Sequence, residues 1–200
     1  RVRYNGKNVS ASFNVWHDQL SDSLGLRPRP DNIFRFRGKQ LTNLSFDYQW
    51  RHSKFYLFGE SAMSFPGGHA HIHGLMTSIH PKIDIGIVYR YLSKDYKVLS
   101  PNAFVENAAT QNEQGLYLAT QLSISRRWSV SAYMDIWKHP WLRFQADAPS
   151  DGQEFLAKIR YYHKRTFESY IQYRRKTRER NFSADGKSNI ITAETRESIR

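Results

Sequence analysis

The sequence contains no cysteine, which excludes disulfide bonds and thiolate chemistry and is compatible with an exported bacterial protein. It also contains no apolar run approaching the roughly 20 residues that a membrane helix needs, so we expect no membrane-spanning helix. Residues 1–8 lack the basic start and apolar core of a signal peptide. Because residues 1–4 and 192–200 read like strands without a natural end, we expect the sequence to be an excerpt of a longer chain.

Acidic residues are few, since 18 Asp and Glu stand against 30 Lys and Arg and give a formal net charge of +12. Such an excess of positive charge favours acidic partners such as lipid head groups, polysaccharide or nucleic acid. The alternative is that the cations line turns and a polar interior, and we prefer this interpretation.

Aromatic residues are abundant, with 12 Tyr, 12 Phe and 5 Trp among 200 residues. They favour the pleated, half-buried surface of a β-sheet. The mean hydropathy is low, at −0.69, and would argue against a protein made of membrane helices. In a membrane β-barrel only alternate residues meet lipid, so the mean hydropathy stays low there as well.

The clearest pattern covers residues 115–125 and 128–137, where apolar and polar residues alternate with a period of two. Such a period over ten residues predicts a strand, because a helix would scatter the apolar residues around its circumference. Only a short connection separates the two segments, which predicts a β-hairpin.

The same alternation recurs along the chain, and its segments are 9–15, 44–51, 55–64, 69–79, 83–91, 154–162, 167–175 and the residues from 191 onward. The sequence therefore predicts an all-β fold, an antiparallel meander of about 9–10 long strands. We expect a single domain over residues 1–200 that forms part or all of an outer-membrane β-barrel, or a fragment of a larger barrel.

Two kinds of connection separate these strands. Four are short and basic, at residues 52–54, 80–82, 125–127 and 163–166, while longer polar ones cover residues 93–114, 138–153 and 176–189, with a short turn at 65–68 as the exception. Tight turns at one rim and long loops at the other are typical of outer-membrane barrels.

Aromatic residues near the strand ends fit the girdles that form at lipid–water interfaces, although aromatic cross-strand pairs in a soluble β-core are the alternative. The predicted lipid-facing residues are Ile85, Ile87, Leu116, Leu118, Leu122, Val130 and Met134. The opposite, interior face is predicted to carry Asp47, Gln49, Gln121, Ser131, Asp135 and Arg174.

His69, His71 and His73 project from one face of a predicted strand. Successive residues on one face lie about 7 Å apart, so two of these histidines could share a metal ion. A polar or interfacial role is the simpler interpretation, and we assign neither a metal nor any other cofactor.

Ser78, His80 and Asp84 straddle one turn and are the residues most suited to catalysis. No nucleophile elbow or paired-carboxylate pattern accompanies them, so we expect the protein not to be an enzyme.

The densest basic cluster consists of Arg174, Arg175, Lys176, Arg178 and Arg180. It suits phosphate groups or nucleic acid. The plainer interpretation, which we prefer, is a strand that runs out into a solvated basic loop.

Five segments carry a resemblance to a known family, and they are Pro101-Asn102-Ala103-Phe104, residues 113–117, residues 128–135, Pro140-Trp141-Leu142-Arg143 and Ala148-Pro149-Ser150-Asp151-Gly152. The region from Leu44 to Asn181 resembles the C-terminal barrel-like region of helix-hairpin-helix, competence-like outer-membrane proteins of Bacteroidota. The resemblance implies a location in the outer membrane of a Gram-negative bacterium and a DNA-handling role for the whole protein. It brings no catalytic residues, and this chain lacks the helix-hairpin-helix module.

We therefore expect a non-enzymatic outer-membrane β-barrel that acts as a scaffold, a channel or a subunit of an envelope complex. Its expected partner is outer-membrane lipid, with other envelope proteins and nucleic acid as open alternatives. A DNA-binding or uptake component that uses the basic cluster is the second hypothesis, and a soluble β-sheet interaction module is the third.

Overall fold

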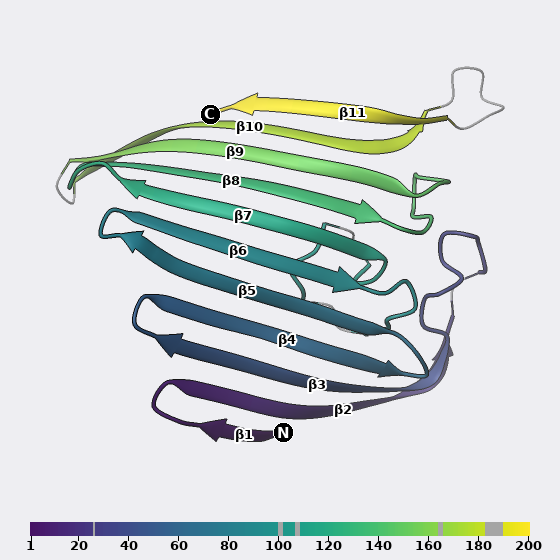
Figure 1. Cartoon of the computed structure of the whole chain (residues 1–200). Coiled ribbons are helices and arrows are strands. Elements are labelled where there is room, and N and C mark those ends of the chain that lie inside the picture. The colour runs from purple at the N-terminus through teal and green to yellow at the C-terminus, as the bar shows by residue number, and fades with distance from the viewer. Residues whose placement is uncertain (26, 100–101, 107–108, 164–165, 183–189) are drawn as a thin grey trace.

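The chain folds into one open antiparallel β-sheet of eleven strands, arranged side by side in sequence order (Figure 1). The computed structural model describes residues 1–25, 27–99, 102–106, 109–163, 166–182 and 190–200. The strands are β1 (Val2–Asn5), β2 (Val9–Leu24), β3 (Gly38–His52), β4 (Phe55–Phe65), β5 (His69–His80), β6 (Ile83–Leu92), β7 (Glu113–Ser123), β8 (Trp128–His139), β9 (Ser150–His163), β10 (Phe167–Phe182) and β11 (Ile190–Ile199). No helix occurs among these described residues.

The predicted all-β antiparallel meander is confirmed, with one more strand than the nine or ten expected. The additional strand is β1, which covers residues that read like a strand in the sequence but, with four residues, is too short to be counted among the alternating segments. The sheet is open between β1 and β11, so closure into a barrel is not part of the observed fold.

The three predicted long loops are shorter than expected, and the one predicted at residues 93–114 ends at residue 112, because β7 begins at Glu113. The loop predicted at residues 138–153 covers only residues 140–149, because β8 ends at His139 and β9 begins at Ser150. The loop predicted from residue 176 begins after Phe182, because β10 continues through the basic cluster. Taken alone, the basic sequence of this segment predicts a loop. Carboxylates on β9 and β11, however, lie beside Lys176, Arg178 and Arg180 and stabilise the strand.

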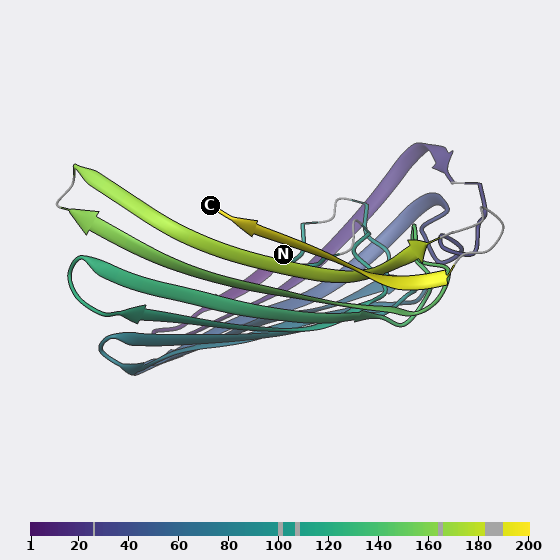
Figure 2. The ribbon, with the colours of Figure 1, turned by 90° about the horizontal axis from the view of Figure 1, so that it is seen from above.

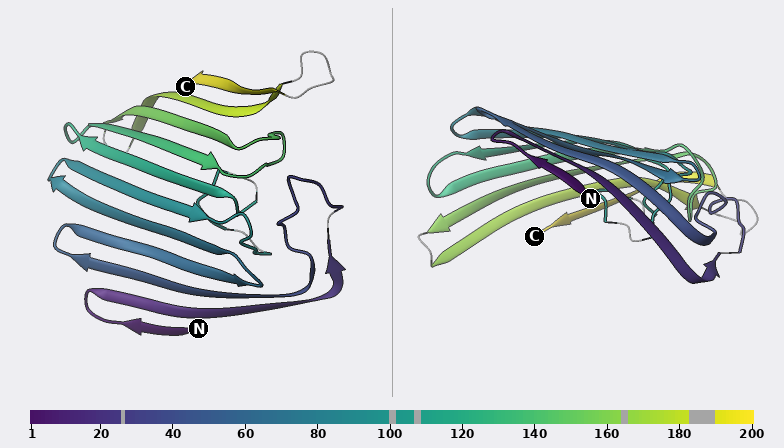
Figure 3. Two further views of the ribbon diagram at one scale, coloured as in Figure 1. Left: turned by 45° about the vertical axis from the view of Figure 1, so that its right-hand side comes forward. Right: turned by 90° about the horizontal axis from the view of Figure 1, so that it is seen from below.

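The sheet is strongly curved, and Figures 2 and 3 show that the described parts of the segment between β6 and β7, residues 93–99, 102–106 and 109–112, fold back into its concave side. We call the face toward this segment the concave face and the other the convex face. Alternation along each strand and the register between strands assign every side chain to one of them. Short turns connect the strands at one end of the sheet, and mostly longer loops connect them at the other (Figure 1).

The apolar core is small and lies where the segment after β6 packs on the concave face. Leu92 and Tyr96 are buried against Ala70, with Val98 and Val105 packed against them. Ser93 fixes the start of this segment, because its backbone N–H donates to the His69 carbonyl and its hydroxyl accepts from the His69 backbone N–H.

The turn between β4 and β5 is shaped by this packing. Gly67 and Gly68 both have positive φ, at 77° and 87°, which favours glycine. A methyl group at Gly68 would overlap the Tyr96 backbone, whereas one at Gly67 would lie 3.5 Å from Asp95 Oδ2, an ordinary contact.

Gly68→Ala is therefore expected to lower the free energy of unfolding by about 2–4 kcal/mol, because backbone strain and overlap act together. Gly67→Ala carries similar strain without the overlap and is expected to cost about 1 kcal/mol. Equilibrium urea unfolding followed by tryptophan fluorescence measures both values. Equal losses in the two variants would argue against close packing of Tyr96 on this turn.

Candidate functional site

The concave face carries most of the charged side chains that the structure encloses. Among the described residues, twelve buried residues are polar or charged and only six are apolar. Soluble proteins show the opposite preference, because unpaired polar groups are costly to bury. The polar interior is therefore the feature from which a function can be argued.

Arg90 on β6 lies at the centre of this face and is fully enclosed. Its Nε donates to Glu113 Oε1 at 2.6 Å, and its Nη1 and Nη2 donate to the two carboxylate oxygens of Asp135 at 2.8 and 3.2 Å. The side chains of Arg90 and Glu113 are 0% exposed. Gly115, directly opposite Arg90 on β7, leaves the space that the guanidinium occupies. The cluster therefore joins β6, β7 and β8 by charge-assisted hydrogen bonds.

Residues 102–106, a part of the covering segment between β6 and β7, are held over the same cluster. The Glu106 backbone N–H donates to both carboxylate oxygens of Glu113, each at 3.0 Å. The Phe104 ring lies 5.2 Å from the Arg90 guanidinium carbon and packs edge-on against Tyr117. This part of the segment therefore covers the middle of the concave face.

A second network lies beside the first, on β9 and β10. Glu154 accepts from Arg174 Nε at 2.9 Å and Nη2 at 2.8 Å, and it also accepts from the Tyr133 hydroxyl. Lys176 Nζ lies 3.1 Å from Glu154 and also pairs with Glu106. Glu106 thus links the covering segment to β10 as well as to the first cluster.

The basic cluster predicted from the sequence is divided between the two faces of β10. Arg174, Lys176, Arg178 and Arg180 lie on the concave face, where they meet the carboxylates of Glu154 and Glu194. Arg175 lies on the convex face and pairs with Glu197 at 3.5 Å, with about half of each side chain exposed. The prediction of a solvated basic loop at these residues is therefore wrong, and the cluster does not form one continuous surface.

Three loops interlock at the long-loop end of the sheet. Lys94 Nζ lies against the rings of Phe34 and Trp141, at 4.6 and 4.7 Å from their centroids, and the two rings pack edge-on against each other. Trp141 Nε1 donates to the Pro30 carbonyl, and the side chain of Asn112 bonds to the backbone of Trp141 in both directions. Residues from three distant parts of the sequence thus close this end of the concave face.

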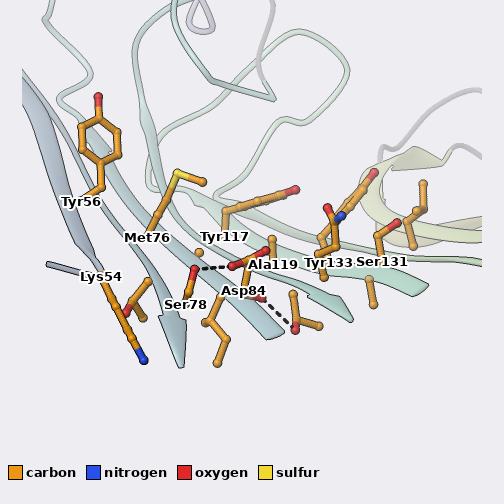
Figure 4. Close-up of a pocket in the computed structure, with 16 residues that line it drawn as sticks. Lys54, Tyr56, Met76, Ser78, Asp84, Tyr117, Ala119, Ser131 and Tyr133 are labelled. Atoms are coloured by element: carbon orange, nitrogen blue, oxygen red, sulfur yellow. Dashed lines mark hydrogen bonds between the residues drawn. The ribbon is translucent and has the colours of Figure 1, made fainter. Parts of the chain in front are cut away.

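The opposite end of the concave face contains a cavity of about 590 Å³ (Figure 4). Small residues at Gly86 and Ala119, directly opposite each other, form its floor. Tyr117, Tyr133 and Ser78 lie around it, and the Ser78 hydroxyl donates to Asp84. The cavity combines aromatic and polar groups, as small-molecule sites do.

The seven residues predicted to face lipid all lie on the convex face. Five of them are 37–39% exposed, namely Ile87, Leu116, Leu118, Leu122 and Met134, while Ile85 and Val130 are half-buried. Three of the seven, Ile87, Leu118 and Met134, belong to an uninterrupted apolar row across β2 to β9, whose other members are Val9, Trp50, Leu57, Leu75 and Phe155.

The residues predicted to face an interior all lie on the concave face, and they are Asp47, Gln49, Gln121, Ser131, Asp135 and Arg174. Asp135 and Arg174 take part in the two ionic networks. Gln121 and Ser131 are cross-strand neighbours that line the cavity.

His69, His71 and His73 lie on the convex face of β5. The rings of His71 and its neighbours are 5.3 and 6.1 Å apart between centroids. His71 Nδ1 bonds to the Ser61 hydroxyl and His73 Nδ1 to the Tyr48 hydroxyl, at 3.0 and 2.9 Å. Over the described ranges, no group of three or more metal-ligating side chains is brought together. The three histidines form part of an aromatic band.

The three residues considered for catalysis are only partly brought together. Ser78 and Asp84 are hydrogen-bonded, but His80 Nδ1 accepts from the Lys82 backbone N–H at 3.2 Å. This arrangement does not orient an imidazole toward a nucleophile.

Sequence reasoning missed Arg90 and Glu113 as the centre of the site, although it placed Asp135 on the interior face. For Arg90 the available signal was a charged residue on the polar side of an alternating strand, whereas Glu113 fell in the loop predicted at residues 93–114. Their meeting depends on the register between three strands, which alternation alone does not give.

Removal of one partner from the buried cluster is expected to be costly. Asp135→Asn should lower the free energy of unfolding by about 3 kcal/mol, because the enclosed Arg90 loses one of its two counter-charges. Glu197→Gln removes a carboxylate from the exposed pair with Arg175 and should cost less than about 1 kcal/mol. Urea unfolding curves of the two variants test this, and a small loss for Asp135→Asn would contradict the central role of the cluster.

Comparison with known proteins gives the chain no family. No protein-family profile matches it, and no curated protein or solved structure is significantly similar to it. Within the described part of the chain, no helix is both long and apolar enough to cross a membrane. The resemblance noted from the sequence stays a prediction, and the arrangement of the two faces is the basis for a functional conclusion.

Proposed function

We propose that the chain is part of the wall of a bacterial outer-membrane β-barrel, a non-enzymatic protein whose convex face meets lipid and whose concave face lines the interior. The observation that carries this proposal is the inverted distribution of side chains. The enclosed residues are mainly polar or charged, while large apolar residues are exposed on almost every strand. In water such a surface would be a strong driving force for association.

The continuous apolar row supports lipid as the partner of the convex face. It crosses eight neighbouring strands, and soluble monomers rarely expose a contiguous apolar surface of that extent, which is typical of a protein or membrane contact. At β10 and β11 the row reaches Arg175 and Glu197, and apolar residues lie nearer the short turns instead, at Ile171, Tyr173 and Ile199. A shift of this kind is expected when tilted strands cross a band of constant height.

Strand length and the two kinds of connection agree with the same proposal. All strands but β1 have ten to sixteen residues, and a tilted membrane crossing needs about 9–11. The aromatic contacts of Trp128 with Tyr161, and of Tyr161 with Phe167, lie near the short-turn end and fit an interfacial girdle.

The interior that we propose is narrowed rather than open. Residues 102–106 lie over Arg90, and three interlocked loops close the long-loop end. A scaffold or a constricted channel therefore fits better than a wide pore. Closure of the wall would require that the edges of β1 and β11 meet each other or further strands, because an unpaired edge inside a membrane leaves backbone groups unsatisfied.

Two alternatives remain distinguishable by experiment. A soluble interaction module would cover its convex face with a partner, and the chain would then stay dispersed without detergent. A nucleic-acid-binding component would rely on the four cations on the concave side of β10, of which Arg174 and Lys176 already pair with Glu154.

The proposal predicts a difference between two positions on one strand. Leu118→Arg places a charge in the apolar row and should destabilise the protein folded in lipid vesicles by about 2–4 kcal/mol. Gln121→Arg makes a comparable change on the exposed concave side of β7 and should be nearly silent. Urea titrations of the refolded variants in vesicles give both values.

The control is the same pair of variants in detergent-free buffer. Retention of wild-type solubility and structure without detergent or lipid would contradict the barrel, as would equal losses at the two positions. Partition of the wild-type chain into vesicles, with resistance to heat unfolding in detergent, is the expected behaviour.

A further inference from the structure

Cations outnumber carboxylates on the concave face at the long-loop end of β10 and β11. Arg178 and Arg180 project there from β10, and Arg196 projects from β11. Among the described residues, Glu194 is the one side-chain carboxylate within ion-pair distance of these three guanidinium groups. In the described part of the chain, a single carboxylate is therefore paired with three permanent positive charges.

The contacts of Glu194 use only a few of the N–H donors of Arg178, Arg180 and Arg196. Its Oε1 accepts from Arg196 at 2.7 Å, in hydrogen-bond geometry. Its Oε2 lies 3.6 Å from Arg178 Nε and 3.3 Å from Arg180 Nη1, but it is buried without a hydrogen-bond partner. Arg180 Nε is likewise buried without a partner among the described residues. A guanidinium has five N–H donors, and such groups are costly to leave unsatisfied.

Arg143, in the loop between β8 and β9, adds a fourth cation to this cluster. Its Nε donates to the Ser150 hydroxyl at 3.0 Å, and its Nη2 donates to the Glu179 backbone carbonyl, both of which are uncharged. Burial lowers the pKa of the Arg143 guanidinium most, and the neighbouring charges of Arg178 and Arg180 lower it further, while the carboxylates of Glu113 and Glu179 oppose this shift in part. The loop is fixed beside β10, because the Asn181 backbone N–H donates to the Gln145 carbonyl.

We propose that Arg143, Arg178 and Arg180, with Arg196 at the edge, form a binding site for a phosphate-type oxyanion. Arg178 and Arg180 contact the same carboxylate oxygen, so they are close enough for one tetrahedral anion to accept from both. Guanidinium groups pair with phosphate through two parallel hydrogen bonds, and a dianion matches the local excess of charge better than a carboxylate does. The side chains of Arg178 and Arg180 are each 29% exposed, so a ligand can reach them.

The phosphate is a soluble ion or ester rather than a lipid head group. All four guanidinium groups lie on the concave face or on the loop beside it, opposite the apolar face that would meet lipid. The site requires only the sheet and its loop, so its existence does not rest on the proposed membrane location.

The test is calorimetric titration of the full chain, folded in detergent micelles, with inorganic phosphate and pyrophosphate, with sodium chloride at matched ionic strength as the blank. We expect a dissociation constant of about 1 mM or lower. Arg180→Gln should weaken binding by about tenfold, because it removes a charge-assisted bidentate contact. Arg175→Gln, the same change on the convex face of the same strand, should alter binding by less than about twofold.

A further variant, Glu194→Gln, distinguishes a phosphate-binding site from a cluster of charges with only a structural role. It removes the carboxylate that competes with the ligand, so phosphate should bind about fivefold more tightly. Circular dichroism establishes that each variant is folded, and Arg178→Gln replaces Arg180→Gln if the latter is not. Absence of binding at about 10 mM phosphate, equal weakening by Arg175→Gln, or weaker binding by Glu194→Gln would overturn the proposal.

A second arm distinguishes the source of the phosphate. Co-sedimentation with phosphatidic acid vesicles, compared with phosphatidylcholine vesicles, should be the same for the wild type and Arg180→Gln. Loss of that binding in Arg180→Gln, with no response to soluble phosphate, would overturn the soluble ligand. Failure of the chain to enter lipid would leave phosphate binding in detergent intact, so the two proposals fail separately.

Discussion

The arrangement of the concave face depends on the enclosure of Arg90 between Glu113 and Asp135. A guanidinium with no access to solvent requires counter-charges in fixed positions, and the two carboxylates come from the two strands that follow β6. Glu113 then uses both oxygens to accept from the backbone of Glu106. The register of three strands and the position of the covering segment are thus set by the same three side chains.

This polar centre explains why the apolar residues lie on the other side of the sheet. Alternation gives each strand only two faces, so a face occupied by ionic networks cannot also supply an apolar core. Three of the six buried apolar residues in the described part of the chain, Ala70, Leu92 and Tyr96, gather where the covering segment meets β5 and β6. In the membrane location that we propose, paired polar groups would stabilise the concave face and lipid would cover the convex face.

The sequence was sufficient to predict which face most side chains take, but not which of them meet. Leu118 and Met134 were assigned correctly because a period of two determines the face without any knowledge of neighbouring strands. Arg90 and Asp135 are 45 residues apart, and their contact depends on register across β7. Lys176 and Arg178 were predicted to lie in a loop. That prediction was wrong because the carboxylates that stabilise them in a strand belong to other strands, β9 and β11.

The distribution of charge across the concave face follows from where carboxylates are placed. At β6 to β8 one cation lies between two carboxylates, whereas at β10 and β11 three cations share one. Glu106 spans the boundary, since its backbone bonds to Glu113 and its side chain pairs with Lys176. The covering segment thus balances part of the positive charge of β10. Arg178 and Arg180 lie beyond its reach and share the carboxylate of Glu194 instead. Among the described residues, the carboxylates near Arg178, Arg180 and Arg196 do not balance their positive charge, and such an excess of charge is a basis for ligand binding, because a mobile anion can supply the missing counter-charge.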